Sequence, residues 1–185
     1  DALFVGEIPD SATLHLSLQA AMAGHLVMTQ LHAEDAASAL LRMVKLTENP
    51  NLVAESSKLI IAQKLLRKLC PHCAKSATPT KQEAARFERA AAALIPFPFD
   101  GELKLKKPQG CPKCAKTGFL GRRAIYELLP VTPELSDALR ASASLDEIRD
   151  LAIDQGMKPL LASALDRVIE GEGHLPDVVH MFGVN

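Results

Sequence analysis

The chain is poor in aromatic residues and has almost no net charge. Its 185 residues include no tryptophan and one tyrosine, and the formal net charge at pH 7 is −1. Proteins that bind nucleic acids usually carry a basic surface that neutralises phosphates, and many stack bases on aromatic side chains. The few local basic groups, such as Lys64, Arg67 and Lys68, are interpreted as solvated faces. The composition therefore argues against nucleic acid as a partner.

Long apolar runs are also missing. No run reaches the roughly 18 residues that a membrane-spanning helix needs, although 48% of the residues are hydrophobic. The first residues do not show the pattern of a signal peptide. We therefore expect a chain with a substantial hydrophobic core that resides in the reducing cytoplasm without crossing a membrane.

Cysteine is confined to two short motifs, Cys70-Pro71-His72-Cys73 and Cys111-Pro112-Lys113-Cys114. Each pair can turn two thiolates toward one point, and two pairs complete the tetrahedral shell of a structural zinc site. Gly118 suits the tight turn after the second pair. Two disulfides are the alternative, but the expected reducing setting disfavours them. We predict a structural zinc ion held by Cys70, Cys73, Cys111 and Cys114, with the long intervening segment tied off as an insertion.

The first third of the chain alternates between strand and helix patterns. Strands are predicted over residues 1–8 and 26–31, and helices over residues 11–22, 35–49 and 52–69. The first strand is expected to be buried. Because a domain seldom begins on a central strand, we also expect further chain before it. Strand, helix, strand, helix, helix is the order typical of a parallel α/β sheet.

The remaining segments are more helical. A helix is predicted over residues 81–94, and the prolines at 96 and 98 exclude regular helix from residues 95–99. A strand is predicted over residues 120–131, followed by a helix that begins at Thr132. Ser144 and Glu147 form the capping box of another helix, and a last helical run ends at Gly171. The final third is thus predicted to be a strand followed by a small helical domain.

Three residues of the first third are candidates for chemistry. Glu7 ends the first strand, where a carboxylate can orient water or a metal ion beside a phosphate; a solvated strand end is the alternative. His25 and His32 flank the second strand. Their odd separation points them to opposite faces, although both could line one crevice. For each histidine, an ordinary polar role is the alternative, and the four cysteines leave no zinc position for either.

Five groups of short motifs occur in order along nearly the whole chain. They are Val5-Gly6-Glu7-Ile8; Gly24-His25-Leu26-Val27 followed by Leu31-His32 and Asp35-Ala36; Ala62-Gln63-Lys64-Leu65-Leu66-Arg67-Lys68-Leu69-Cys70; Gly118-Phe119-Leu120-Gly121-Arg122; and Ile125-Tyr126-Glu127. Together they resemble the type II secretion and type IV pilus assembly ATPases.

The resemblance implies an α/β fold that is the C-terminal part of a RecA-like P-loop ATPase core. Residues 1–69 would be the second half of this core, residues 70–118 an inserted tetracysteine zinc subdomain, and residues 119–185 a strand plus a small C-terminal helical domain. The whole protein would be a homo-hexamer that hydrolyses ATP with Mg²⁺. It would act with inner-membrane platform proteins and cytoplasmic assembly proteins, as a peripheral protein at the cytoplasmic face of the inner membrane.

The resemblance also implies roles for single residues. Glu7 matches the Walker B glutamate, which helps to orient the attacking water and the magnesium shell. His25 and His32 match the histidine box, in which a histidine senses the γ-phosphate; His32 is the better candidate for catalysis and His25 for nucleotide binding. Arg122 matches a position near the nucleotide base. Glu7 and His32 are therefore the predicted catalytic residues, and His25 and Arg122 the predicted nucleotide-binding residues.

The chain departs from the family pattern at several positions. Pro9 replaces an arginine, Ala12 a glutamate, Ala33-Glu34 a Thr-Asn pair, and Lys64 an arginine. In addition, no Gly-rich Gly-Lys-Ser/Thr loop occurs in the 185 residues, although its backbone donors and lysine are what hold the phosphates. We therefore expect this chain alone not to hydrolyse ATP.

Two other functions compete with that of a motor. One is a non-catalytic assembly or regulatory module of the same family, in which the altered motifs mark a lost active site. The other is a zinc-ribbon nucleic-acid binder, which the neutral charge and few aromatic residues disfavour. Secretion, pilus extension and DNA uptake remain open as the process served, as does the symmetry of the ring.

Overall fold

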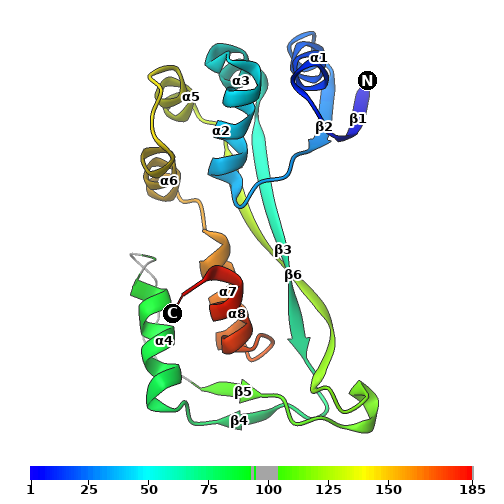
Figure 1. The fold of residues 1–185 in the computed structure, drawn as a ribbon, viewed down its shortest axis with the longest axis vertical. Coiled ribbons are helices and arrows are strands. Elements are labelled where there is room, and N and C mark those ends of the chain that lie inside the picture. Colours follow the sequence, from blue (N-terminus) through cyan, green and yellow to red (C-terminus); the bar gives the residue numbers. More distant parts are fainter. Residues whose placement is uncertain (93, 95–103, 185) are drawn as a thin grey trace. The chain divides into compact units, whose positions relative to one another are not determined.

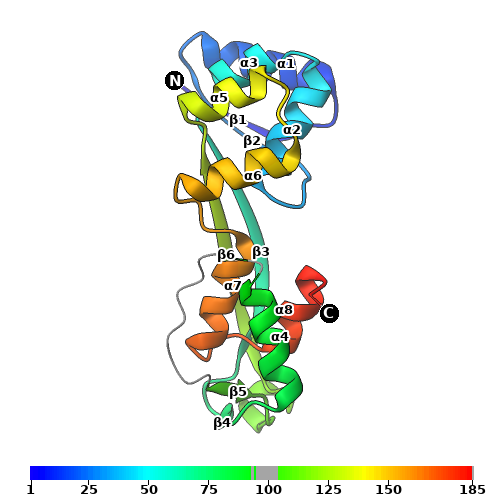
Figure 2. The ribbon, with the colours of Figure 1, turned by 90° about the vertical axis from the view of Figure 1, so that its left-hand side faces the viewer.

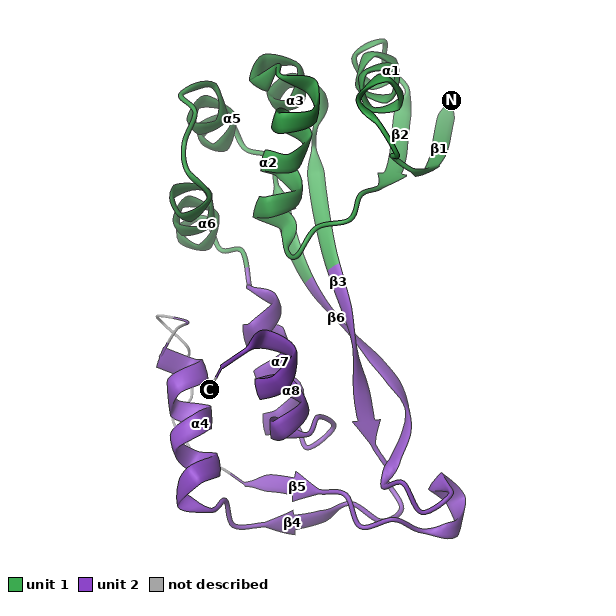
Figure 3. Ribbon diagram, in the orientation of Figure 1, with its two compact units in different colours: residues 1–62, 127–157 green, residues 63–126, 158–185 purple. Residues whose placement is uncertain are grey.

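The computed structural model describes residues 1–92, 94 and 104–184. The chain divides into two compact units, shown in Figure 3. Unit 1 contains Asp1–Ala62 and Glu127–Met157, and unit 2 contains Gln63–Tyr126 and Lys158–Asn185. The three-part division into residues 1–69, 70–118 and 119–185 stays a prediction.

Unit 1 begins with a strand, a helix and a second strand, as the sequence predicts. These are β1 (Ala2–Glu7), α1 (Ser11–Met22) and β2 (Leu26–Gln30). The two strands pair in parallel, with Ala2 opposite Leu26 and Glu7 opposite Gln30. Figure 1 shows α1 beside the strands that it connects. The prediction of a parallel α/β arrangement is confirmed for this part of the chain, and both strands end at the same edge.

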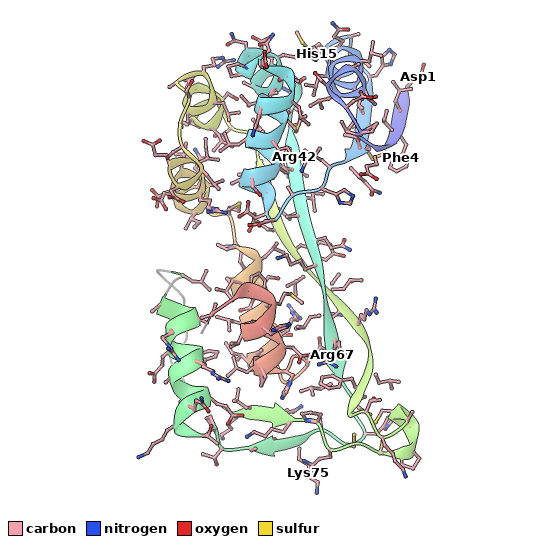
Figure 4. All side chains as sticks on the ribbon, in the orientation of Figure 1. Asp1, Phe4, His15, Arg42, Arg67 and Lys75 are labelled. Carbon is pink, nitrogen blue, oxygen red and sulfur yellow. The ribbon has the colours of Figure 1, made fainter. Side chains whose placement is uncertain are left out.

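The first strand is more exposed than its sequence predicts. Phe4, labelled on β1 in Figure 4, is 69% exposed and Leu3 is 42% exposed, whereas Ile8, just beyond the strand, is 4% exposed. Among the described residues, β1 pairs with β2 in a two-stranded sheet. The prediction of a buried strand is therefore wrong for this chain, because apolar side chains become buried only where a second layer covers them.

Two helices follow β2, and the second is shorter than predicted. Helix α2 spans Ala36–Thr47 with a capping box of Asp35 and Ser38, and α3 spans Pro50–Ser56 with Asn49 as its N-cap. Residues 52–69 do not form one helix, since β3 begins at Leu59 and runs to Leu69. The prediction of one helix over residues 52–69 is therefore wrong.

Pairing with a distant segment explains this correction. Strand β3 pairs with β6 (Phe119–Pro130), which confirms the strand predicted over residues 120–131. The amide of Val131 donates to Lys58 at one end, and that of Cys70 donates to Gly118 at the other, so the strands run antiparallel. Exposed residues alternate with less exposed ones along most of β3. The leucines of this segment fit a helical stripe, but strand pairing overrides helix propensity.

The helices after β6 complete the core of unit 1. Thr132 caps α5 (Pro133–Arg140), and Ser144 with Glu147 forms the capping box of α6 (Leu145–Asp154), as predicted. Helix α5 packs on α3, and α6 packs on α2 and α5. The buried cluster includes Leu14, Leu40, Val53, Leu129, Leu135, Leu139 and Ile148.

Unit 2 surrounds the cysteines. Strands β4 (Lys75–Ala77) and β5 (Leu105–Lys107) pair antiparallel. Helix α4 (Lys81–Ala92) contacts α7 (Leu160–Ile169) and α8 (Leu175–Phe182), as Figures 1 and 2 show. The helix predicted from residue 81 is confirmed as far as Ala92, and the prediction for residues 95–99 lies outside the described residues.

The C-terminal helix is tied to β3 by charged groups. Arg67, labelled on β3 in Figure 4, donates two hydrogen bonds to Asp177 on α8, at 2.7 and 2.9 Å. Burial raises the pKa of Asp177, but Arg67 and His174 outweigh this and hold the pKa below its usual value.

In residues 1–92, 94 and 104–184, no helix is both long and apolar enough for a membrane crossing.

Candidate functional site

The four cysteines meet in unit 2. Their sulfur atoms all lie within 4.8 Å of one another. Sγ of Cys111 lies 3.9 Å from that of Cys70 and 3.7 Å from that of Cys114, and Sγ of Cys73 lies 3.8 Å from that of Cys114. Sulfurs at the corners of a tetrahedron around zinc, with Zn–S of about 2.3 Å, lie about 3.8 Å apart. The donor set therefore fits a tetrahedral metal ion such as Zn²⁺.

The alternative of two disulfides does not describe this cluster. All four cysteines are free, and the separations between their sulfurs far exceed the bonded S–S length of about 2.05 Å.

The turn after the second cysteine pair, Cys111 and Cys114, depends on its backbone conformation. Gly118 has φ of +80°, and a Cβ there would lie 2.4 Å from Cβ of Pro108. The expected need for glycine in this turn is thus confirmed.

Backbone amides point at the sulfur of Cys114. The N–H groups of Cys111 and Gly118 both donate to Sγ of Cys114, at 3.2 Å. Burial raises the pKa of Cys114, but these donors and the thiols of Cys111 and Cys73 outweigh it and lower the pKa to about 6. Burial raises the pKa of Cys73 to about 11. The thiolate is the form of cysteine that binds metals, so the lowered pKa favours the metal-binding form of Cys114.

The two predicted catalytic residues meet in unit 1. Nε2 of His32 lies 3.0 Å from Oε1 of Glu7. Glu7 is the last residue of β1, and His32 follows the end of β2. Because parallel strands present their carboxyl ends at one edge, the topology brings both side chains to the same place. The side chains are 60% and 83% exposed, so a ligand at this edge could reach both of them.

The strand pairing is irregular next to Glu7. The register shifts between Val5 and Glu7, and Ile8 then donates its amide to the carbonyl of Gln30 at 3.0 Å. Such irregularities redirect side chains near strand ends. The shift in register comes directly before Glu7, whose carboxylate contacts His32.

The two predicted nucleotide-binding residues lie elsewhere. His25 is exposed and directly precedes β2, whereas His32 follows that strand, so the two histidines flank its opposite ends. Seven residues at about 3.3 Å each place them at most about 23 Å apart. Arg122 is exposed on β6 within unit 2. Roles for both residues stay predictions.

Comparison with known proteins decides the family. The sequence profile of the family described as "Type II/IV secretion system protein" matches residues 1–180. The chain belongs to this family. It is 34% identical over 98% of its length to the type IV pilus assembly ATPase TfpB of Acinetobacter baylyi. It is 37% identical over 96% of its length to the type IV pilus assembly ATPase PilB of Pseudomonas aeruginosa, and it spans 30% of each of these relatives.

Solved structures share the fold of this type II/IV secretion system protein. The ATPase DotB of Yersinia pseudotuberculosis matches 100% of the chain with a TM-score of 0.63 and 16% identity. The ATPase DotB of Legionella pneumophila matches 98% with a TM-score of 0.61 and 17% identity. The chain covers 37% and 38% of these two structures. At such low identity, the likeness shows the fold alone.

Three charged residues meet at the start of α2, and the sequence-based prediction gives none of them a functional role, although Asp35 and Glu127 belong to the motifs of the resemblance. Glu127 of β6 accepts a hydrogen bond from the amide of Ala36, and Asp35 pairs with Arg149 of α6. Glu127 lies between Ile125 and Leu129 on the buried side of β6, and only 4% of it is exposed. The sequence does hold one signal for Glu127, namely a carboxylate at an inward position of a strand. Buried carboxylates need hydrogen-bond partners, so such a position indicates a specific contact.

Proposed function

We propose that this type II/IV secretion system protein is the C-terminal part of a motor ATPase that powers type II secretion or type IV pilus assembly. The observation that carries the proposal is the 3.0 Å contact between Glu7 and His32 at the carboxyl edge of two parallel strands. Ligands of open α/β sheets bind at this edge. The named relatives support the same reading, since they are type IV pilus assembly ATPases.

In the proposed mechanism, the Glu7 carboxylate orients the attacking water by accepting its hydrogen bond. His32 contacts the γ-phosphate, and its contact with Glu7 orients its ring. For His25 and Arg122, the proposed role in nucleotide binding rests on the resemblance to the family alone. Mg²⁺, when bound with ATP, would neutralise phosphate charge. The cysteine cluster would hold a structural zinc ion, because four thiolates leave no position for water.

The full-length protein is proposed to work as a homo-hexamer. It would bind peripherally at the cytoplasmic face of the inner membrane, together with platform and assembly proteins of the apparatus. The second candidate is the non-catalytic module of the same family. Pro9 and Ala12, which replace charged residues of the family pattern just after Glu7, are the observation that favours it.

His32→Ala in the full-length protein tests the proposed site. The rate of ATP hydrolysis should fall about tenfold, because a hydrogen bond to a charged group contributes about 1.5 kcal/mol. Phosphate release at saturating ATP measures the effect. His15→Ala is the control, since His15 on α1 contacts Ser11 of the same helix. Equal rates for the two variants would count against a role for His32.

The 185 residues alone should show no ATP hydrolysis and, at most, weak self-association. They contain no Gly-Lys-Ser/Thr loop, and phosphates are held mainly by that loop's backbone donors. Phosphate release by the purified chain and its sedimentation behaviour test both points. Turnover that copurifies with the chain and disappears in Glu7→Gln would show that the nucleotide binds without such a loop.

A further inference from the structure

The contact between Glu7 and His32 is not held by its own surroundings. Both side chains are more than half exposed, at 60% and 83%. An exposed ion pair contributes little free energy and does not by itself keep two side chains in one geometry. The position of His32 must therefore be set through its backbone. On one side this backbone is held by β2, which pairs with β1.

On the other side, the backbone is held at the start of α2. Only Ala33 and Glu34 separate His32 from the N-cap residue Asp35. Three residues span at most about 10 Å, so the first turn of α2 limits where His32 can lie. Figure 1 shows the connection from β2 running to this end of α2. Any group that fixes the first turn of α2 therefore also restrains His32.

A buried carboxylate fixes this turn. Oε1 of Glu127 accepts a hydrogen bond from the amide of Ala36 at 2.8 Å. Ala36 is fully buried and Glu127 is 4% exposed. The first amides of a helix have no partner within the helix, and a negative charge there is favoured by the helix dipole. Glu127 thus joins β6 to the first residue of α2 through a hydrogen bond that is buried away from water.

An ion pair fixes the same turn from α6. Oδ2 of Asp35 accepts hydrogen bonds from Nη2 and Nε of Arg149, at 2.6 and 3.0 Å. The other oxygen, Oδ1, accepts the amide of Ser38 at 2.7 Å and caps α2. Burial raises the pKa of Asp35, but Ser38 and Arg149 outweigh it and lower the pKa. Asp35 therefore caps α2 and fastens it to α6 at the same time.

We propose that Glu127 and the Asp35–Arg149 ion pair are positioning residues, which hold His32 against Glu7 by fixing the first turn of α2. This inference rests on the proposed function, because it assigns the two supports a role in ATP hydrolysis. Neither support needs to touch the nucleotide. Their effect on the rate passes through His32.

The experiment uses the full-length protein and separates kcat from KM for ATP. Glu127→Leu removes the acceptor of the Ala36 amide, and kcat should fall about tenfold, since a displacement of about 1 Å can cost up to a hundredfold. KM should change little. Glu127→Gln keeps an oxygen for that amide and should rescue most of the rate. Arg149→Gln should lower kcat about two- to fivefold, as expected for a partly exposed pair.

Arg140→Gln is the matched control for Arg149→Gln. Arg140 lies on the neighbouring helix α5, where it pairs with Asp137 of the same helix and with Glu55 of α3. It should leave kcat unchanged. Because the side chain of Arg149 is 35% exposed, its variant keeps the test valid even if Glu127→Leu does not fold.

The decisive measurement is kcat of Glu127→Leu and of Arg149→Gln, each combined with His32→Ala in a double variant. Residues that act through one group give non-additive losses. Glu127→Leu and Arg149→Gln should therefore cause no further loss of kcat once His32 is absent. Equal losses with and without His32 would overturn the positioning role while leaving the proposed function intact. Absence of turnover in the wild-type protein, or an unchanged rate in His32→Ala, would instead overturn the proposed function and the inference with it.

Discussion

Glu7→Gln in the full-length protein is expected to lower ATP hydrolysis about a hundredfold or more while leaving ATP binding largely intact. Glutamine keeps the shape of the side chain but loses the charge that orients water and stabilises the transition state. The phosphates, in contrast, are held mainly by backbone donors. Phosphate release gives the rate, and titration with a fluorescent ATP analogue gives the affinity.

Glu48→Gln provides the control for the loss of one negative charge. Glu48 is exposed at the C-terminal end of α2, away from the carboxyl edge of β1 and β2. Its variant should hydrolyse ATP at the wild-type rate. Hydrolysis by Glu7→Gln within a few fold of the wild type would show that another residue positions the water.

The purified protein is expected to contain about one zinc ion per chain, and removing a ligand should loosen unit 2. Binding of structural zinc supplies about 10 kcal/mol or more in small domains, and this free energy is lost with the site. Cys111→Ser should therefore lower thermal stability and make the segment between the two cysteine pairs sensitive to protease. Elemental analysis, thermal unfolding and limited proteolysis measure these effects.

His72→Ala is the control for the metal site. His72 lies between Cys70 and Cys73 but is exposed, and it is not among the four clustered cysteines. It should bind zinc as the wild type does. Absence of metal from the wild-type protein, or disulfide-linked cysteines under reducing conditions, would contradict the metal site.

Local signals in the sequence predict much of the fold. The helix over residues 11–22 and the caps at Thr132 and Ser144 are found as predicted, because each depends on residues within one or two turns. Residues 59–69 were predicted wrongly because their state depends on pairing with β6, which lies far along the chain. The exposure of β1 depends on which layers cover it, and local sequence does not report this.

The candidate site shows the same division. The spacing of the cysteines predicts a cluster, and the structure brings all four sulfurs together. The supports of His32 are different, since Glu127 is 91 residues from Ala36 and Arg149 is 114 residues from Asp35. No local pattern pairs residues at such separations. Only the packing of β6 and α6 against the start of α2 reveals them.

Hydrolysis of ATP by the full-length wild-type protein, measured beside its support of pilus assembly or secretion in cells, tests the motor function most directly. A motor should turn over ATP, and Glu7→Gln should abolish assembly or secretion together with turnover. If the wild-type protein shows no turnover and Glu7→Gln still supports assembly or secretion, Pro9 and Ala12 mark a lost active site. The protein would then be the non-catalytic module of its family.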